Sequence, residues 1–182
     1  TQRSESWIRK ELTITGVRTW KELRGESCVS IDEPPHKKSI CTSRSFSGSG
    51  LNKLADVEEA VANFAAACSR KLREGHIVCS SVTVFAHTSR FRIDVPQTYI
   101  YRTINLVVPT NDMQELVSVA VKTLREDWKE GGFLYKKAGV IVWNTCEDKA
   151  IQGNLFDEVN REKQAALAKA IDAINHKNGH NT

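Results

Sequence analysis

The chain has 182 residues, of which 40% are hydrophobic and 26% are charged, and its formal net charge is +4. This composition suits one or two globular domains, and no apolar run is long enough to cross a bilayer. The positive charge favours an anionic partner without demanding one. The chain opens inside a helical pattern without Met or a signal peptide, so we expect a piece of a longer protein.

Motifs for catalysis or metal binding are missing from the sequence. The five cysteines form no CxxC pair, and neither an HExxH spacing, a Walker loop nor a GxGxxG run occurs. The acidic candidates for a metal-dependent centre form no recognisable motif; they are Asp32, Asp94, Asp112 and Asp127. We therefore expect reduced cysteines, no metal site, no cofactor and no catalysis in this segment.

Residues 1 to 30 carry two short helical patterns, WIRKEL and VRTWKELRG, with a predicted turn at Thr15 and Gly16 and a stop at Gly25. Their apolar face is too small for this unit to fold alone. Pro34 and Pro35 follow, and because proline favours extended chain, this stretch is predicted to be a linker.

Residues 37 to 75 change to a strand followed by a helix. The stretch 37–46 is rich in β-formers, and a flexible run over 47–50 closes it. A strong apolar stripe then predicts a helix that Asp56 caps, with Glu59 in the capping-box position and Gly75 at its end.

Residues 77 to 143 continue with two strands, a helix and a last strand. The strands are expected over 77–92 and 98–108. The helix begins at Asp112 and stops at Gly131–Gly132, and a strand over 136–143 follows. The predicted order is β-α-β-β-α-β, an α+β fold in which both helices cover one face of a four-stranded sheet.

The second face of this predicted sheet is open and polar. Alternation places hydroxyl groups and rings on it, among them Ser81, Thr83, Phe85, Tyr99 and Tyr101. Such a face with basic edges can bind nucleic acid, and it can equally be a solvated face without a partner. A ferredoxin-like RNA-binding module that stacks bases on the two tyrosines is an alternative, although the RNP1 pattern is missing.

The tail from Asn144 is predicted to be a loop over 144–158, then a helix over 160–177. Leu155 and Phe156 are large apolar residues in an acidic, loop-like stretch. By pattern alone, these two residues are better interpreted as anchoring the tail to the domain's own core (a staple) than as inserting into a pocket of a partner protein. A protein-interaction domain working through this tail is a third reading.

Four stretches in order, GVRTWKELRG, KKSICTSRSF, LYKKAGVIVW and AIQGNLFDE, resemble the Y-family translesion DNA polymerases, and most closely the UmuC-like (ImpB/MucB/SamB) branch. The resemblance covers nearly the whole chain. It implies the end of a thumb domain and a linker over 1–33, a little-finger domain over 34–145 and a C-terminal extension over 146–182. The metal-binding carboxylates of the palm, which hold Mg²⁺, would precede this chain.

The resemblance also implies that the little finger holds the phosphates of duplex primer-template DNA. Ser43, Arg44 and Ser45 fall on the family's DNA-contacting first strand. Strict alternation conflicts with this for Arg44, which shares a side with Ile40 and Phe46; a bulge or an edge position would resolve the conflict. The full set of expected phosphate contacts is Lys37, Lys38, Ser43, Arg44, Ser45, Arg90, Arg92, Arg102, Lys136 and Lys137.

The segment QGNLF resembles the family's clamp-binding peptide. Gln152, Leu155 and Phe156 match its polar and apolar positions, whereas Gly153 stands where a large apolar residue is usual. The resemblance implies a bacterial sliding clamp as partner, with a UmuD-like subunit and a recombinase filament as further candidates. It also implies a cytoplasmic protein of the SOS damage response.

Overall fold

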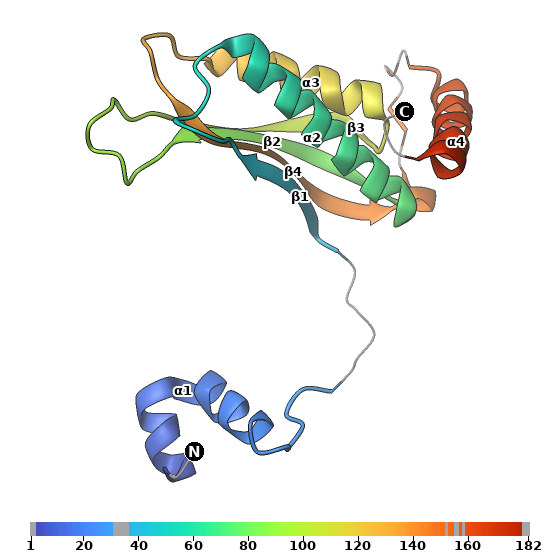
Figure 1. Ribbon diagram of the computed structural model, residues 1–182. Coiled ribbons are helices and arrows are strands. Elements are labelled where there is room, and N and C mark those ends of the chain that lie inside the picture. Colours follow the sequence, from blue (N-terminus) through green and yellow to red (C-terminus); the bar gives the residue numbers. More distant parts are fainter. Residues whose placement is uncertain (1–2, 31–36, 152, 155–156, 158, 180–182) are drawn as a thin grey trace. The chain divides into compact units, whose positions relative to one another are not determined.

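The computed structural model describes residues 3–30, 37–151, 153–154, 157 and 159–179, and it divides the chain into two compact units. Unit 1 is Thr1–His36 and unit 2 is Lys37–Thr182 (Figure 1). No helix of the described residues is both long and apolar enough to span a membrane.

Unit 1 contains helix α1 (Glu5–Glu22), which begins after Ser4 and is kinked at Thr13 (φ 61°, ψ −170°). The two predicted helical stretches are therefore present, but the break does not lie at Thr15 and Gly16. Gly16 lies in the turn that follows the kink, where an added Cβ would be 2.3 Å from Leu12 Cβ. Its role is to allow this close approach.

Unit 2 has the predicted element order and the α+β class. Figure 1 shows α2 and α3 on one face of a four-stranded antiparallel sheet with strand order β1-β4-β2-β3. The elements are β1 (Ser39–Ser45), α2 (Leu54–Glu74), β2 (Ile77–Thr88), β3 (Tyr99–Thr110), α3 (Met113–Asp127), β4 (Tyr135–Glu147), η1 (Asp148–Ala150) and α4 (Arg161–Asn178).

The core lies between the helices and the sheet. Apolar residues three or four apart put one face of each helix toward the sheet, and residues two apart put one face of each strand toward the helices. The fully buried side chains include Val57, Val61, Leu72, Leu116, Leu124, Val82, Val84, Val140 and Val142.

The start of α2 corrects one prediction. The helix begins at Leu54 after Lys53, and no side chain caps it. Asp56 lies in the first turn instead, where its charge still stabilises the N-terminal end of the helix. The predicted end at Gly75 is confirmed.

The hairpin from β2 to β3 is closed earlier than predicted. Thr88 is the last residue of β2, because its amide donates to the Thr98 carbonyl (3.1 Å) and its hydroxyl to Gln97 Oε1 (2.8 Å). The prediction of strand as far as residue 92 is therefore wrong, and residues 89–98 form a loop.

The predicted cap of α3 is confirmed, since Asp112 Oδ1 accepts a hydrogen bond from the Glu115 amide (2.8 Å). The helix ends at Asp127, before the glycine pair, and the ring of Trp128 packs on Tyr135 (centroids 4.6 Å apart).

Strand β4 is longer than predicted. The strand continues through Glu147, and residues 145–147, expected in a loop, pair with the start of β2, where Val78 faces Cys146 and Ile77 faces Glu147.

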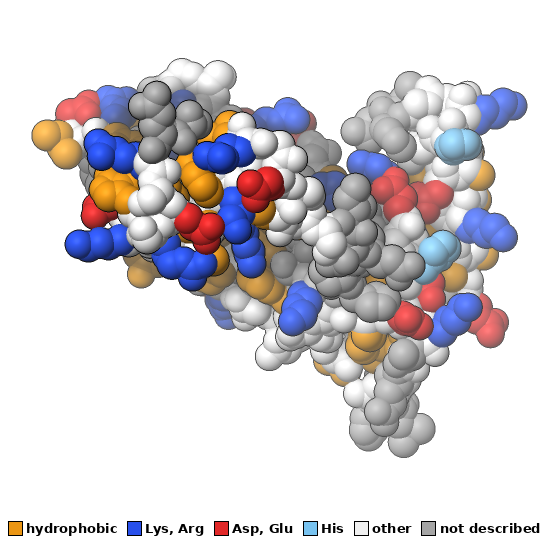
Figure 2. Space-filling view, turned by 90° about the horizontal axis from the view of Figure 1, so that it is seen from below, with side chains coloured by type: hydrophobic (Ala, Val, Ile, Leu, Met, Phe, Trp, Pro, Cys, Tyr) orange, Lys and Arg blue, Asp and Glu red, His pale blue; other side chains and the backbone are white. Residues whose placement is uncertain are grey.

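Charged groups hold α4 against the rest of unit 2. Arg73 binds both carboxylate oxygens of Asp172 (2.7 Å each), and Arg161 donates to Glu115 Oε2 (2.6 Å) and Asp157 Oδ2 (2.7 Å). None of the described residues of α4 is fully buried, and Figure 2 shows charges of both signs over this helix, at the right of the view. Ion pairs therefore contribute much of its docking.

Low pH is expected to loosen α4. The hydrogen bonds from Arg73 lower the pKa of Asp172. A carboxyl group with a depressed folded pKa contributes stability above its unfolded pKa of about 4, and this contribution is lost as the pH falls through the folded value. Asp172→Asn should therefore speed amide hydrogen exchange in α4 at neutral pH, and the difference from wild type should disappear in acid.

Glu59→Gln is the matched control, because it removes an exposed carboxylate from α2 that has no ion pair within the described residues. Equal exchange in wild type and Asp172→Asn at neutral pH would contradict a role for this ion pair.

Candidate nucleic-acid interface

The face of the sheet opposite the helices, here called the open face, consists of four cross-strand rows. The strand pairing fixes their members. Row 1 contains Ser45, Lys137, His87 and Tyr99; row 2 contains Ser43, Gly139, Phe85 and Tyr101; row 3 contains Cys41, Ile141, Thr83 and Thr103; row 4 contains Ser39, Trp143, Ser81 and Asn105.

Rows 3 and 4 satisfy much of their polarity internally. The hydroxyls of Thr83 and Thr103 lie 2.7 Å apart, and Trp143 Nε1 donates to Thr83 Oγ1 (2.8 Å). Ser81 Oγ donates to Asn105 Oδ1 (2.9 Å). These bonds explain why two polar side chains of β2, Ser81 and Thr83, are buried on a face without helices.

Row 2 is flat because of Gly139. An added Cβ there would lie 2.5 Å from both Phe85 Cζ and Ser43 Cβ, so the missing side chain leaves room for the Phe85 ring. Phe85 also stacks on His87 of row 1 (centroids 6.5 Å apart, planes 15° apart). Rings of two rows thus form one continuous floor.

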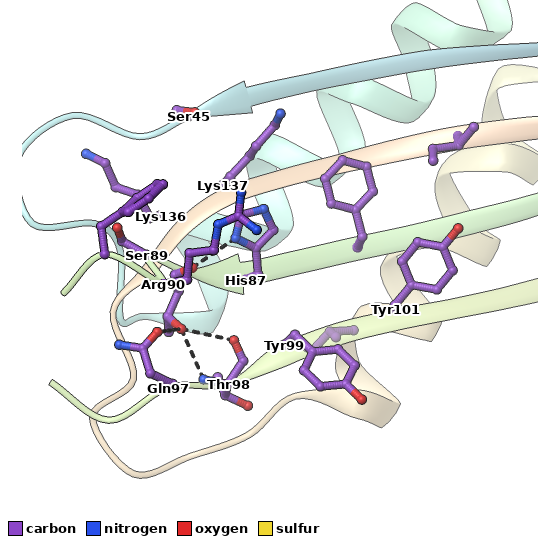
Figure 3. Close-up of a pocket in the computed structure, with 15 residues that line it drawn as sticks. Ser45, His87, Ser89, Arg90, Gln97, Thr98, Tyr99, Tyr101, Lys136 and Lys137 are labelled. Carbon is purple, nitrogen blue, oxygen red and sulfur yellow. Dashed lines mark hydrogen bonds between the residues drawn. The ribbon is translucent and has the colours of Figure 1, made fainter. Parts of the chain in front are cut away.

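Row 1 and the loop 89–98 enclose a hollow of about 1030 Å³ at one end of the open face. Figure 3 shows Ser45, Lys136, Lys137, His87 and Arg90 at one end of this hollow, with the two labelled tyrosines farther along β3. The cations Arg90, Lys136 and Lys137 line it, and no carboxylate does so among the described residues.

The arginines of α2 and α3 differ from the cations of the hollow because they are paired with carboxylates. Arg125 binds Glu58, Arg70 binds Glu74 (2.7 Å), and Arg73 binds Asp172. Within the described part of the chain, Lys137 and Arg90 have no ion-pair partner, although Arg90 lies over the Phe91 ring (5.3 Å). Positive potential therefore gathers at the hollow.

The structure brings together five of the residues predicted to contact phosphate. Ser45, Arg90, Lys136 and Lys137 line the hollow, and Ser43 lies in the adjoining row. Lys136 is partly engaged, since its ammonium group donates to the Gly48 carbonyl (2.9 Å) and the Phe46 carbonyl.

Two of the predicted arginines lie on the helix side of the sheet. Arg44 pairs in register with Ala138, a core residue, and it lines a shallow pocket with Asp56 and Glu59 of α2. The pairing of β1 with β4 has no register shift, so an edge position, not a bulge, accommodates Arg44. Arg102 binds Asp127 (2.8 Å) and Glu126 (3.2 Å), and the hydrogen bond from Arg102 to Asp127 raises the pKa of Arg102.

Three further predicted residues lie away from the hollow. Arg92 is held by Asp94 within the loop, and this ion pair lowers the pKa of Asp94. Lys37 and Lys38 precede β1 at the opposite end of the sheet, where Thr145 Oγ1 donates to the Lys37 carbonyl.

Gly139 was not singled out from the sequence, although a glycine inside a strand pattern is a signal of close approach. Gln152, Leu155 and Phe156, the expected clamp contacts, lie outside the described residues. Among the residues that are described, no group of three His, Cys, Asp or Glu side chains could hold a metal ion.

The strand order, the single helical layer and the open second face agree with a domain of the little-finger type. Residues 37–155 match the family model for the impB/mucB/samB family C-terminal domain. The chain belongs to this family.

Proteins of the same family align along most of the chain. It is 35% identical to protein UmuC of Salmonella typhimurium over 97% of the chain and 42% of UmuC. It is 36% identical to protein SamB of Salmonella typhimurium and to protein MucB of Escherichia coli, over 94% and 93% of the chain and 40% of each relative. The chain thus spans about two fifths of the length of these relatives.

Replacing Gly139 tests the flat floor of the open face. Gly139→Ala should lower the free energy of unfolding by about 1–3 kcal/mol, because the methyl group must displace Phe85 or Ser43. Denaturant unfolding measures the change. Gly153→Ala is the control, since its added methyl meets none of the described residues within 4 Å. Unchanged stability of Gly139→Ala would show that the Phe85 ring moves aside without cost.

Proposed function

We propose that this chain is the DNA-binding, non-catalytic C-terminal part of an error-prone translesion DNA polymerase. The open face grips duplex primer-template DNA through its phosphates. The observation that carries the proposal is the hollow in a domain of the impB/mucB/samB family. Among the residues that the structure describes, Arg90 and Lys137 line this hollow without an ion-pair partner, and no carboxylate lines it.

The proposed domain division follows the family resemblance. Residues 1–33 are the end of the thumb and a linker, 34–145 the little finger and 146–182 a C-terminal extension. The polymerase centre and its Mg²⁺ belong to a palm domain outside this chain. The parent protein acts in the bacterial cytoplasm during the SOS response, and a UmuD-like subunit and a recombinase filament are further proposed partners.

Phosphate contacts suit a polymerase that must accept damaged templates. They position a protein on the duplex and carry no base information, so the grip is the same on any sequence. Lys137 and Arg90 supply the charge, while Ser43 and Ser45 offer hydroxyl and amide donors along β1. Arg44 and Arg102 do not belong to this proposed surface, because both lie on the helix side.

The salt dependence of DNA binding tests the proposed surface. Each phosphate contact contributes about 0.9 to the slope of log K against log salt concentration. Lys137→Ala combined with Arg90→Ala should therefore flatten the slope for blunt duplex by about 2. The size of this change should not depend on the sequence of the duplex. Fluorescence anisotropy at several salt concentrations measures it.

The control is Lys122→Ala combined with Arg70→Ala, which removes the same charge from the helical layer. If the control flattens the slope equally, net charge and not the open face determines binding. Single-stranded RNA in the same assay tests the RNA-binding alternative, which predicts that RNA binds tighter than duplex DNA.

The second part of the proposal is a tether to the bacterial sliding clamp through Gln152, Leu155 and Phe156. The ends of this segment are fixed, which supports its presentation to a partner. Before it, the Asp148 amide donates to the His76 carbonyl (3.0 Å); after it, Arg161 binds Glu115. Burying two large apolar side chains contributes on the order of 3–6 kcal/mol, less roughly 1–2 kcal/mol for each residue that becomes ordered. Because ordering the segment offsets part of this gain, we expect micromolar and not nanomolar affinity.

Leu155→Ala combined with Phe156→Ala should abolish clamp binding and leave DNA affinity and the melting temperature unchanged. The control is Leu167→Ala combined with Ile174→Ala, which removes side chains of α4 that are 48% and 56% exposed. Titration of the clamp measures the affinity of each variant, and a thermal melt measures its stability. A clear fall in melting temperature without clamp binding in the wild type would identify a staple onto the domain's own core.

A further inference from the structure

Four rings form a block at the hollow of the open face. Row 1 places Tyr99 opposite His87, and row 2 places Tyr101 opposite Phe85. His87 and Phe85 lie in the floor, whereas Tyr99 and Tyr101 on the outer strand are 72% and 59% exposed. In Figure 3 these two tyrosines lie along β3, beyond the basic end of the hollow.

The side chains of the same strand in rows 3 and 4 behave differently. Thr103 and Asn105 are used in hydrogen bonds to β2. The hydroxyls of Tyr99 and Tyr101 have no hydrogen bond within the described residues, and no apolar layer covers their rings. Their exposed faces are therefore left for a ligand.

Cations lie beside these rings. Lys129 Nζ lies 5.9 Å from the centroid of Tyr99, and Arg90 and Lys137 line the same hollow. A flat apolar group and an anion attached to it would both find partners here. A nucleotide has this chemistry, since its base presents a flat face and its phosphate a charge.

We propose that the tyrosine side of the hollow binds unpaired nucleotides of single-stranded DNA, with the bases stacked on Tyr99 and Tyr101 and the phosphates held by Arg90 and Lys129. The inference rests on the proposed DNA-binding face and assigns a second class of ligand to it. Bases inside a duplex cover one another's faces and offer only their edges in the grooves. Exposed ring faces therefore suit a strand that has left the duplex, such as the template overhang at a primer end.

The test compares three DNA probes on the whole chain. These are blunt duplex, the same duplex with a single-stranded overhang, and oligo-dT. Tyr99→Ala combined with Tyr101→Ala should weaken oligo-dT binding about tenfold or more, cancel the gain that the overhang gives, and change blunt-duplex affinity less than twofold. Tyr99→Phe combined with Tyr101→Phe keeps the ring faces and should bind all three probes like the wild type.

Melting temperatures should stay constant in both variants, because the two side chains are exposed. Unchanged oligo-dT affinity in the alanine variant, or an equal loss on blunt duplex, would overturn the inference while the phosphate grip stands. Oligo-dT binding that needs the tyrosines, together with no binding of blunt duplex, would overturn the proposed duplex grip and leave this site in place. Tenfold tighter binding of oligo-U than of oligo-dT would overturn the assignment to DNA.

Discussion

One-sided burial of the sheet is the constraint on which the rest of unit 2 depends. The apolar faces of α2 and α3 cover one side, and the valines of β2 and β4 complete a core there. Both helices pack on the same side of the sheet, so within the described residues of unit 2 no apolar layer covers the other side. Its side chains must satisfy one another or contact solvent and ligands. In rows 3 and 4 the side chains satisfy one another through hydrogen bonds of Thr83, Trp143 and Ser81. In rows 1 and 2 the side chains are left to contact solvent or a ligand.

The distribution of charge also differs between the helical layer and the open face. Arginines of the helical layer are neutralised by carboxylates that lie on neighbouring helices or one turn away, as in the pair of Arg125 with Glu58. A paired arginine gives little positive potential to its surroundings. The open face has few acidic side chains, so Lys137 and Arg90 keep their field at the hollow.

The C-terminal helix α4 is attached mainly by ion pairs, unlike α2 and α3, which pack on the sheet through apolar faces. None of the described residues of α4 is fully buried, and its arginine–carboxylate pairs are directional and partly exposed. Such pairs fix the position of a helix more than they stabilise it. These pairs fix the position of the C-terminal end of the segment that carries the proposed clamp peptide. The end of β4 fixes its N-terminal end.

The sequence by itself determined the α+β class, the element order, the helix-facing stripes and the cap at Asp112, because these follow from local periodicity and capping chemistry. It also carried the family resemblance, which the family match bears out. Strand order and register were decided only in the tertiary structure, because pairing joins residues far apart in the chain. Pairing put Arg44 and Arg102 on the helix side, extended β4 through residue 147, and brought Gly139 under Phe85. The hollow follows from that pairing, since its lining comes from all four strands and from a loop whose closure depends on Thr88 and Gln97.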